Sequence, residues 1–192
     1  MNEKLLANVR FYFAQSVFNS NCHFKAYNRI NDKIKITSKI VASFSAITLI
    51  LLILQIIGLE QKCQSLLNVL AYIGMLLTGV TLVFEMFNKE DMSFQMFQHK
   101  VFAEKYKSLR DEYMSLIEDI MSNPSYEKKQ RKRHRKLQKK YSQIGENSPE
   151  TTNEDYKLSQ KSLGLAGNSD EEFTWSDKEI DLFLPEKLRL KK

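Results

Sequence analysis

The chain has 192 residues, a formal net charge of +6 and 43% hydrophobic residues, with only six glycines and three prolines. So few helix breakers favour a mainly helical protein, and the length allows one modest domain or a membrane hairpin with soluble flanks. The sequence has no paired carboxylates, no nucleophile–base set and no Cys or His spacing typical of zinc. We therefore expect no enzyme activity, no cofactor and no metal.

The first segment, residues 1–38, is predicted to be a cytoplasmic amphipathic helix. Residues 3–35 contain neither proline nor glycine. Apolar side chains recur near the helical period along this stretch, at Leu6, Val9, Phe13, Val17, Phe24 and Tyr27. Such a stripe indicates a helix that packs on other protein or lies at a membrane surface.

Two uncharged stretches follow, from Ile40 to Leu59 and from Cys63 to Phe84. A helix needs about 20 apolar residues to cross a hydrocarbon layer of about 30 Å, and each stretch is long enough. In lipid the backbone must satisfy its own hydrogen bonds, so helix is the expected conformation. We predict an all-α membrane protein whose transmembrane helical hairpin covers residues 39–86, with spans at about 39–59 and 63–85.

The basic residues near the spans predict the orientation. Five lysines or arginines precede the first span between Lys25 and Lys39, whereas the connecting turn has only Lys62. Lysines follow the second span and lead into a strongly basic block. Because basic flanks stay on the cytoplasmic side, both termini are predicted to be cytoplasmic.

Small and polar residues recur on one face of each predicted span. The candidates are Ser45, Thr48 and Gln55 in the first span, and Gly74, Thr78, Thr81 and Glu85 in the second. One interpretation is close helix packing, with hydroxyl groups bonding across the contact. The other is an aqueous path lined by these faces, which requires a homo-oligomer because one hairpin cannot enclose a pore. Glu85 then lies either among the headgroups or in a cation-favouring ring at the inner mouth.

Residues 87–122 are predicted to form a cytoplasmic helix with a heptad seam. The seam comprises His99, Phe102, Tyr106, Leu109 and Tyr113, and it continues to Leu116 and Ile120. Its spacing predicts a partner helix, for which the N-terminal helix is the candidate. A histidine on such an apolar face is more often a satisfied core residue than a ligand.

A basic helix is predicted over residues 123–144, and a flexible acidic tail with a short terminal helix over 145–192. The block from Lys128 to Lys140 holds nine basic residues. Candidates for binding lipid or another anion are Arg131, Lys132, Arg133, Arg135 and Lys136. Anionic lipid is favoured over nucleotide phosphates, and nucleic acid is not favoured because no aromatic residues are interleaved. In the tail, Ser176 to Glu179 match a capping box.

The order of these segments resembles that of the SLATT family of two-span proteins. The likeness covers about residues 5–120 and rests on Arg10, Phe11, Arg29, Phe87, His99, Tyr106 and Leu109. It leaves the last 70 residues unexplained. The resemblance implies an effector of bacterial conflict and antiviral systems, located in the inner membrane. It also implies a partner, a sensor or an enzyme that produces a nucleotide second messenger.

Two functions are therefore expected as alternatives. In the first, the chain oligomerises and forms a pore or disrupts the membrane when a signal triggers it. In the second, the chain is a membrane anchor or scaffold that recruits a soluble partner through its cytoplasmic helices and tail.

Overall fold

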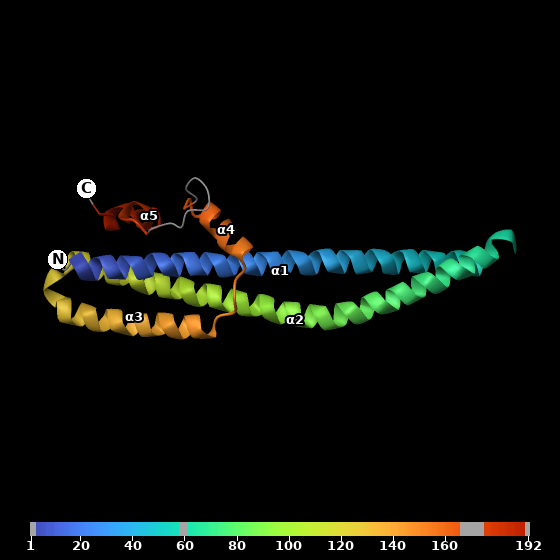
Figure 1. Ribbon diagram of the computed structural model, residues 1–192, viewed down its shortest axis with the longest axis horizontal. Helices are drawn as coiled ribbons and strands as arrows, with labels where there is room; N and C mark the ends of the chain where they lie inside the picture. Colours follow the sequence, from blue (N-terminus) through green and yellow to red (C-terminus); the bar gives the residue numbers. More distant parts are fainter. Residues whose placement is uncertain (1–2, 58–60, 166–174, 191–192) are drawn as a thin grey trace. The chain divides into compact units, whose positions relative to one another are not determined.

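The computed structural model describes residues 3–57, 61–165 and 175–190 (Figure 1). Within these ranges the chain forms helices, turns and connecting segments, with no strand, which confirms the predicted all-α class. The elements are α1 (Glu3–Ile57), α2 (Gln61–Ser122), η1 (Pro124–Tyr126), α3 (Glu127–Asn147), α4 (Asn153–Ser162), α5 (Asp177–Asp181) and η2 (Glu186–Leu188).

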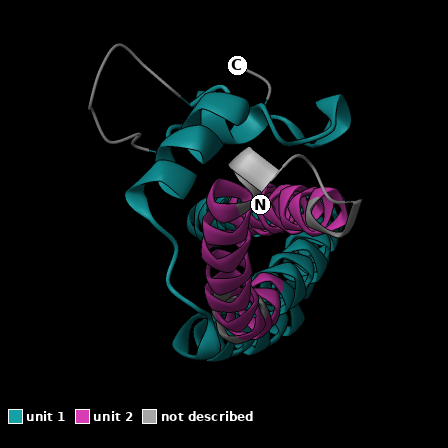
Figure 2. Cartoon of the chain, turned by 90° about the vertical axis from the view of Figure 1, so that its right-hand side faces the viewer, with its two compact units in different colours: residues 1–27, 97–192 teal, residues 28–96 magenta. Residues whose placement is uncertain are grey.

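The chain divides into two compact units, coloured separately in Figure 2. Unit 1 comprises residues 1–27 and 97–192, and unit 2 comprises residues 28–96. The two long helices α1 and α2 each contribute to both units. A helix of 55 or 62 residues far exceeds an ordinary globular helix, and its two ends meet different surroundings.

The core of unit 1 is built where the seam of α2 faces the start of α1. Phe102, Tyr106, Leu109 and Tyr113 are all buried, and they cluster with buried residues of α1 that include Val9 and Phe13. The helix α3 adds Leu137 and Ile144 to the same core, and the C-terminal segment adds Ile180 and Leu184. Three helices and a terminal segment therefore share one apolar interior.

The acidic tail contains a helix that its composition does not indicate. Thr152 is the N-cap of α4, and its side chain accepts a hydrogen bond from the Asp155 backbone N–H. The Asp155 carboxylate in turn accepts from the Thr152 N–H, at 3.0 Å. This reciprocal capping box lets a polar stretch begin a helix, because it satisfies otherwise orphaned backbone donors.

Unit 2 turns its large apolar side chains outward. Leu76 is 70% exposed and Met86 is 73% exposed. Two helices, within Glu3–Leu54 and Ser65–Val83, are long and apolar enough to cross a membrane. The most apolar window of each has a mean hydropathy of 2.0 and is only 6% buried. Such a continuous apolar surface marks an interaction with lipid or with other apolar surfaces.

Candidate functional site

Thr48 and Thr78 make a close polar contact between the two helices of unit 2. Their Oγ1 atoms are 2.9 Å apart, and the Thr48 hydroxyl also lies 3.3 Å from the Gly74 carbonyl oxygen and 3.0 Å from that of Phe44. A hydroxyl has one proton, so Thr48 donates to one acceptor and accepts from Thr78 when it donates to a carbonyl. Thr48 is 8% exposed, which places this contact inside the helix pair.

Gly74 allows this contact because it has no side chain. A Cβ at this position would lie 3.2 Å from the Thr48 Oγ1, which is tighter than ordinary packing. The neighbouring Ala71 is also small and is 4% exposed. The two helices of unit 2 therefore meet through small and hydroxyl-bearing residues, as helices in lipid commonly do.

The other predicted residues of the spans have different surroundings. Ser38 donates a hydrogen bond to the Glu85 carboxylate at 3.2 Å. Thr81 donates back to its own helix, to the carbonyl of Leu77 or Thr78. Ser45 is half-buried, and the side chain of Gln55 lies outside the described part of the structure. The structure thus brings together Thr48, Gly74 and Thr78, but directs Thr81 elsewhere.

Two histidines meet in the interior of unit 1. His23 of α1 and His99 of α2 are each 4% exposed, with their Nδ1 atoms 3.0 Å apart. One ring must donate and the other accept, so the pair is stable only when at most one of the facing nitrogens carries a proton. Tyr106 stacks on His23, with ring centroids 5.6 Å apart.

Burial and, to a smaller extent, the nearby His99 lower the pKa of His23 to about 4, although Asp155 opposes the shift. The His23 imidazole is accordingly neutral at physiological pH in the folded chain. Sequence reasoning placed His99 on the seam but missed His23. The available signal was its spacing of seven residues from Ser16, which is also buried on α1.

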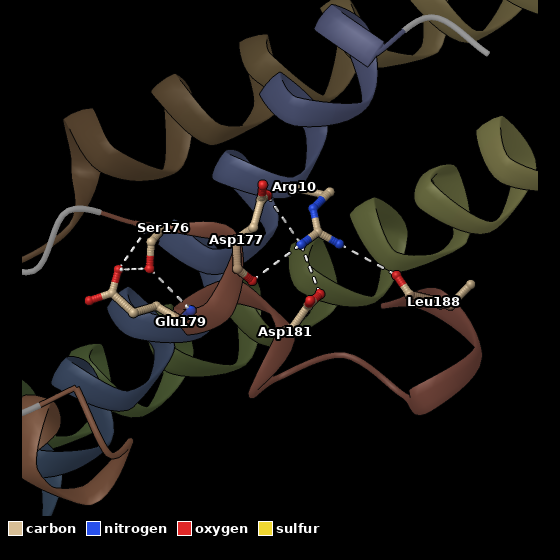
Figure 3. Close-up of polar contacts among 6 residues, drawn as sticks. All are labelled: Arg10, Ser176, Asp177, Glu179, Asp181 and Leu188. Carbon is tan, nitrogen blue, oxygen red and sulfur yellow. Dashed lines mark hydrogen bonds and ion pairs between the residues drawn. The ribbon is translucent and has the colours of Figure 1, made fainter. Parts of the chain in front are cut away.

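Arg10 is a fully buried charge in unit 1, and the C-terminal segment supplies its partners (Figure 3). Its Nη2 lies 2.8 Å from the Asp181 Oδ1 and 3.4 Å from the Asp177 Oδ1. The guanidinium also donates to the backbone carbonyls of Asp177 and Leu188, each at 3.4 Å. Two carboxylates and two carbonyls therefore surround one cation, which offsets the cost of removing it from water.

The capping box predicted at Ser176 is present and shapes this contact. The Ser176 side chain accepts from the Glu179 N–H, and the Glu179 carboxylate accepts from the Ser176 N–H (Figure 3). The helix α5 that begins here places Asp177 and Asp181 four residues apart on one face. That spacing was the signal in the sequence for a basic partner, although it did not identify Arg10.

The five basic candidates of α3 face two separate hollows. Lys132, Arg133 and Lys136 line a hollow of about 720 Å³ together with Glu118 and Asp119 of α2. Arg131 and Arg135 line a smaller hollow of about 280 Å³. These residues alternate around α3 and line hollows on different sides of the helix, so the basic block is not a single site.

A model of the family "SMODS and SLOG-associating 2TM effector domain family 4" matches residues 5–179. Comparison with curated proteins and with solved structures finds no match. The family match confirms the resemblance drawn from the sequence and extends it well beyond residue 120. It covers α3, α4 and the start of α5, so the basic helix and most of the acidic tail belong to the same domain as the two apolar segments. Within the described residues, no three His, Cys, Asp or Glu side chains gather so as to hold a metal ion.

Proposed function

The chain belongs to the SMODS and SLOG-associating two-transmembrane effector domain family, and from this premise we propose that it permeabilises the bacterial inner membrane when a sensor or a nucleotide signal triggers it. The family description supplies two transmembrane segments and an effector role. The additional steps are the hairpin topology, the oligomer and the pore, and each has support in particular residues.

The outward apolar surface of unit 2 is the observation that carries the proposal. Residues such as Tyr72 and Leu76 are each 70% exposed, whereas Thr48 is 8% exposed and faces the neighbouring helix. This arrangement is the reverse of that in a water-soluble helix pair, and lipid is the solvent that stabilises it. The concentration of lysines and arginines before the first span and after the second supports a cytoplasmic location for both termini.

An oligomer is required for a pore because two helices enclose no channel. The contact at Thr48 and Thr78 already uses the polar groups of one hairpin against each other, which favours the helix-packing interpretation of these two residues. Glu85 and Ser38 lie outside that contact and are joined by a hydrogen bond. In an assembly of several hairpins, we propose that the Glu85 carboxylates form the ring that attracts cations.

Membrane potential measures this function directly. We expect cells that express the triggered or overexpressed protein to depolarise, as reported by a potential-sensitive dye. A Thr78→Leu plus Glu85→Leu variant should insert into the membrane yet lose this effect. The matched control is Leu76→Val plus Val83→Leu, which changes two exposed apolar side chains of the same helix and should retain it. An intact potential with the triggered wild-type protein would overturn the proposal.

The alternative is a membrane anchor that recruits a soluble partner. The exposed basic side chains of α3, among them Arg131, Lys132 and Lys136, favour it because they form a charged surface outside the apolar core. Charge reversal of these three residues in the full-length chain separates the two functions. An anchor would lose its partner and its biological effect together, whereas a pore-former would still depolarise the membrane when overexpressed.

A further inference from the structure

The smaller of the two basic hollows lies between the first turns of α1 and the middle of α3. It has a volume of about 280 Å³. Its walls are formed by Lys4, Leu5, Asn8, Arg131, His134, Arg135 and Gln138. Three of these side chains carry a positive charge, two are amides that can donate hydrogen bonds, and no carboxylate lines the hollow.

The larger hollow provides a comparison on the same helix. There the cations of α3 face Glu118 and Asp119, and they also face the end of α2. That end carries carbonyl groups, two of which accept hydrogen bonds from Gln130, at 3.1 and 2.9 Å. Four cations, Lys129 included, line this hollow, and its two carboxylates and the carbonyl end of α2 balance part of their charge.

The smaller hollow has no carboxylate in its own wall. Arg131 pairs with Glu127, which lies one turn earlier on α3, at 2.7 Å. Among the described ion pairs, none includes Lys4 or Arg135. The first turn of α1 adds the partial positive charge of a helix N-terminus beside Lys4, which favours a negative charge there. The exposed Glu3 of that turn does not line the hollow.

His134 is a second and independent feature of this place. The side chain is 5% exposed, and neither ring nitrogen has a hydrogen-bond partner. Its ring lies against Tyr12 and Tyr113, with centroids 5.7 and 6.1 Å away. Burial lowers the pKa of His134, because it removes water from the charged form of the ring. An anion in the hollow would accept a hydrogen bond from the imidazole and stabilise its protonated form.

We propose that this hollow is a binding site for a phosphate group of a soluble small molecule. Lys4, Arg131 and Arg135 neutralise the charge, and Asn8 and Gln138 donate to its oxygens. The volume lies at the lower limit of ligand pockets, so the hollow holds a phosphate or diphosphate group and leaves the rest of the molecule outside.

The position along α1 favours a soluble compound over a lipid headgroup. The chain leaves unit 1 after Tyr27 and enters the apolar segment farther on. Lys4 and Tyr27 are separated by roughly 35 Å along the helix, at about 1.5 Å per residue. Within unit 1, the hollow therefore lies at the opposite end of α1 from the residue at which the chain leaves the unit. The site does not depend on whether the protein forms a pore.

The test uses the full-length protein in nanodiscs of neutral lipid, with inorganic diphosphate as the probe. We expect diphosphate to raise the unfolding temperature more than sulfate at equal ionic strength. Lys4→Gln and Arg135→Gln should each weaken diphosphate binding about tenfold, since each removes a charge-assisted contact. Lys132→Gln, which removes a cation from the larger hollow, is the matched control and should bind as the wild type does.

Histidine ring resonances locate the bound ion. The chain has three histidines, and only His134 adjoins the hollow. Diphosphate should shift the His134 ring signals in the wild type but not those of His23 and His99. Absence of stabilisation, or an equal loss in Lys132→Gln, would overturn the site. Capture of phosphatidylglycerol vesicles that diphosphate competes away, and that Arg135→Gln abolishes, would keep the site but overturn the choice of a soluble ligand.

Discussion

Units 1 and 2 are built from the same two long helices but place their apolar side chains in opposite directions. On α2, Leu109 is 0% exposed in unit 1, whereas Leu76 is 70% exposed in unit 2. Large side chains fill the interior of unit 1, and small ones form the helix contact of unit 2. Helical periodicity therefore locates the face on which a helix packs against its neighbour. The residue types on that face indicate whether the opposite face meets water or lipid.

The two units also differ in the polar groups that they bury and in the partners of those groups. Unit 1 buries Arg10 and the pair His23–His99 and gives them partners from other segments. In unit 2 the central polar contact is between two threonine hydroxyls, which need only one another and a carbonyl. Buried charges demand several partners, so unit 1 should be the more sensitive of the two to single substitutions.

Truncating one leucine in each unit is the strongest test of this comparison. Leu109→Ala should lower the free energy of unfolding by about 2–5 kcal/mol, because it leaves a cavity in a closed core. Leu76→Ala on the same helix should change it by less than about 1 kcal/mol, because its side chain contacts no core. Helix content followed by circular dichroism during denaturant titration in detergent measures both. Equal losses would show that unit 2 has a closed interior of its own.

Lowering the pH should reduce the free energy of unfolding of unit 1 nearly as much as Leu109→Ala does. Because the pKa of His23 is lowered in the folded state, the unfolded chain binds more protons between about pH 6.5 and 4. The stability is therefore complete above about pH 6.5 and is lost as the pH falls toward 4, by an amount on the order of 3 kcal/mol. His134 adds to the trend in the same direction, whereas Asp155, which faces His23, opposes it.

The single tryptophan provides the measurement for the pH effect. Trp175 packs against the core of unit 1, so its fluorescence reports unfolding of that unit. His23→Gln should reduce the slope of stability against pH relative to the wild type. An unchanged slope in this variant would mean that the buried histidine pair does not govern the acid sensitivity of unit 1.

The next largest effect is expected at the ion pairs of Arg10. Asp181→Asn removes the closer carboxylate, which is 21% exposed, and should destabilise docking of the C-terminal segment by about 1–3 kcal/mol. Asp177→Asn is the matched control, because this side chain is 61% exposed and its distance to Arg10 is longer, so the loss should be smaller. Amide hydrogen exchange at Ile180 and Leu184 would report the difference. Slower exchange in Asp181→Asn than in Asp177→Asn would contradict the assigned pairing.

The sequence predicts the elements that rest on local patterns and misses the contacts between distant segments. The apolar stretches, the seam from Phe102 to Tyr113 and the cap at Ser176 follow from periodicity or short-range chemistry. The ion pair of Arg10 with Asp181 joins residues 171 positions apart, and no local pattern identifies such a partner. The helix α4 was not predicted because its composition is polar. A single capping box at its start nevertheless allows the helix to form. The division of the basic block between two hollows depends on residues of α1 and α2 that form their other walls. The sequence of the block alone does not show which residues those are.

The smallest expected effect tests the helix contact of unit 2 at a single atom. Gly74→Ala places a Cβ 3.2 Å from the Thr48 Oγ1, so the Thr48 side chain must give way and the Thr48–Thr78 bond should weaken. The expected cost is about 0.5–1 kcal/mol, the range of interhelical hydrogen bonds in membranes. Gly79→Ala on the same helix meets nothing within 4 Å and should be neutral or slightly stabilising, because alanine favours helix. Cross-linking between cysteines introduced at Ser38 and Glu85, whose side chains are hydrogen-bonded across the two helices, would compare the two variants as the detergent concentration rises. If Gly79→Ala separates the helices as much as Gly74→Ala does, the close approach at Thr48 is not what joins them.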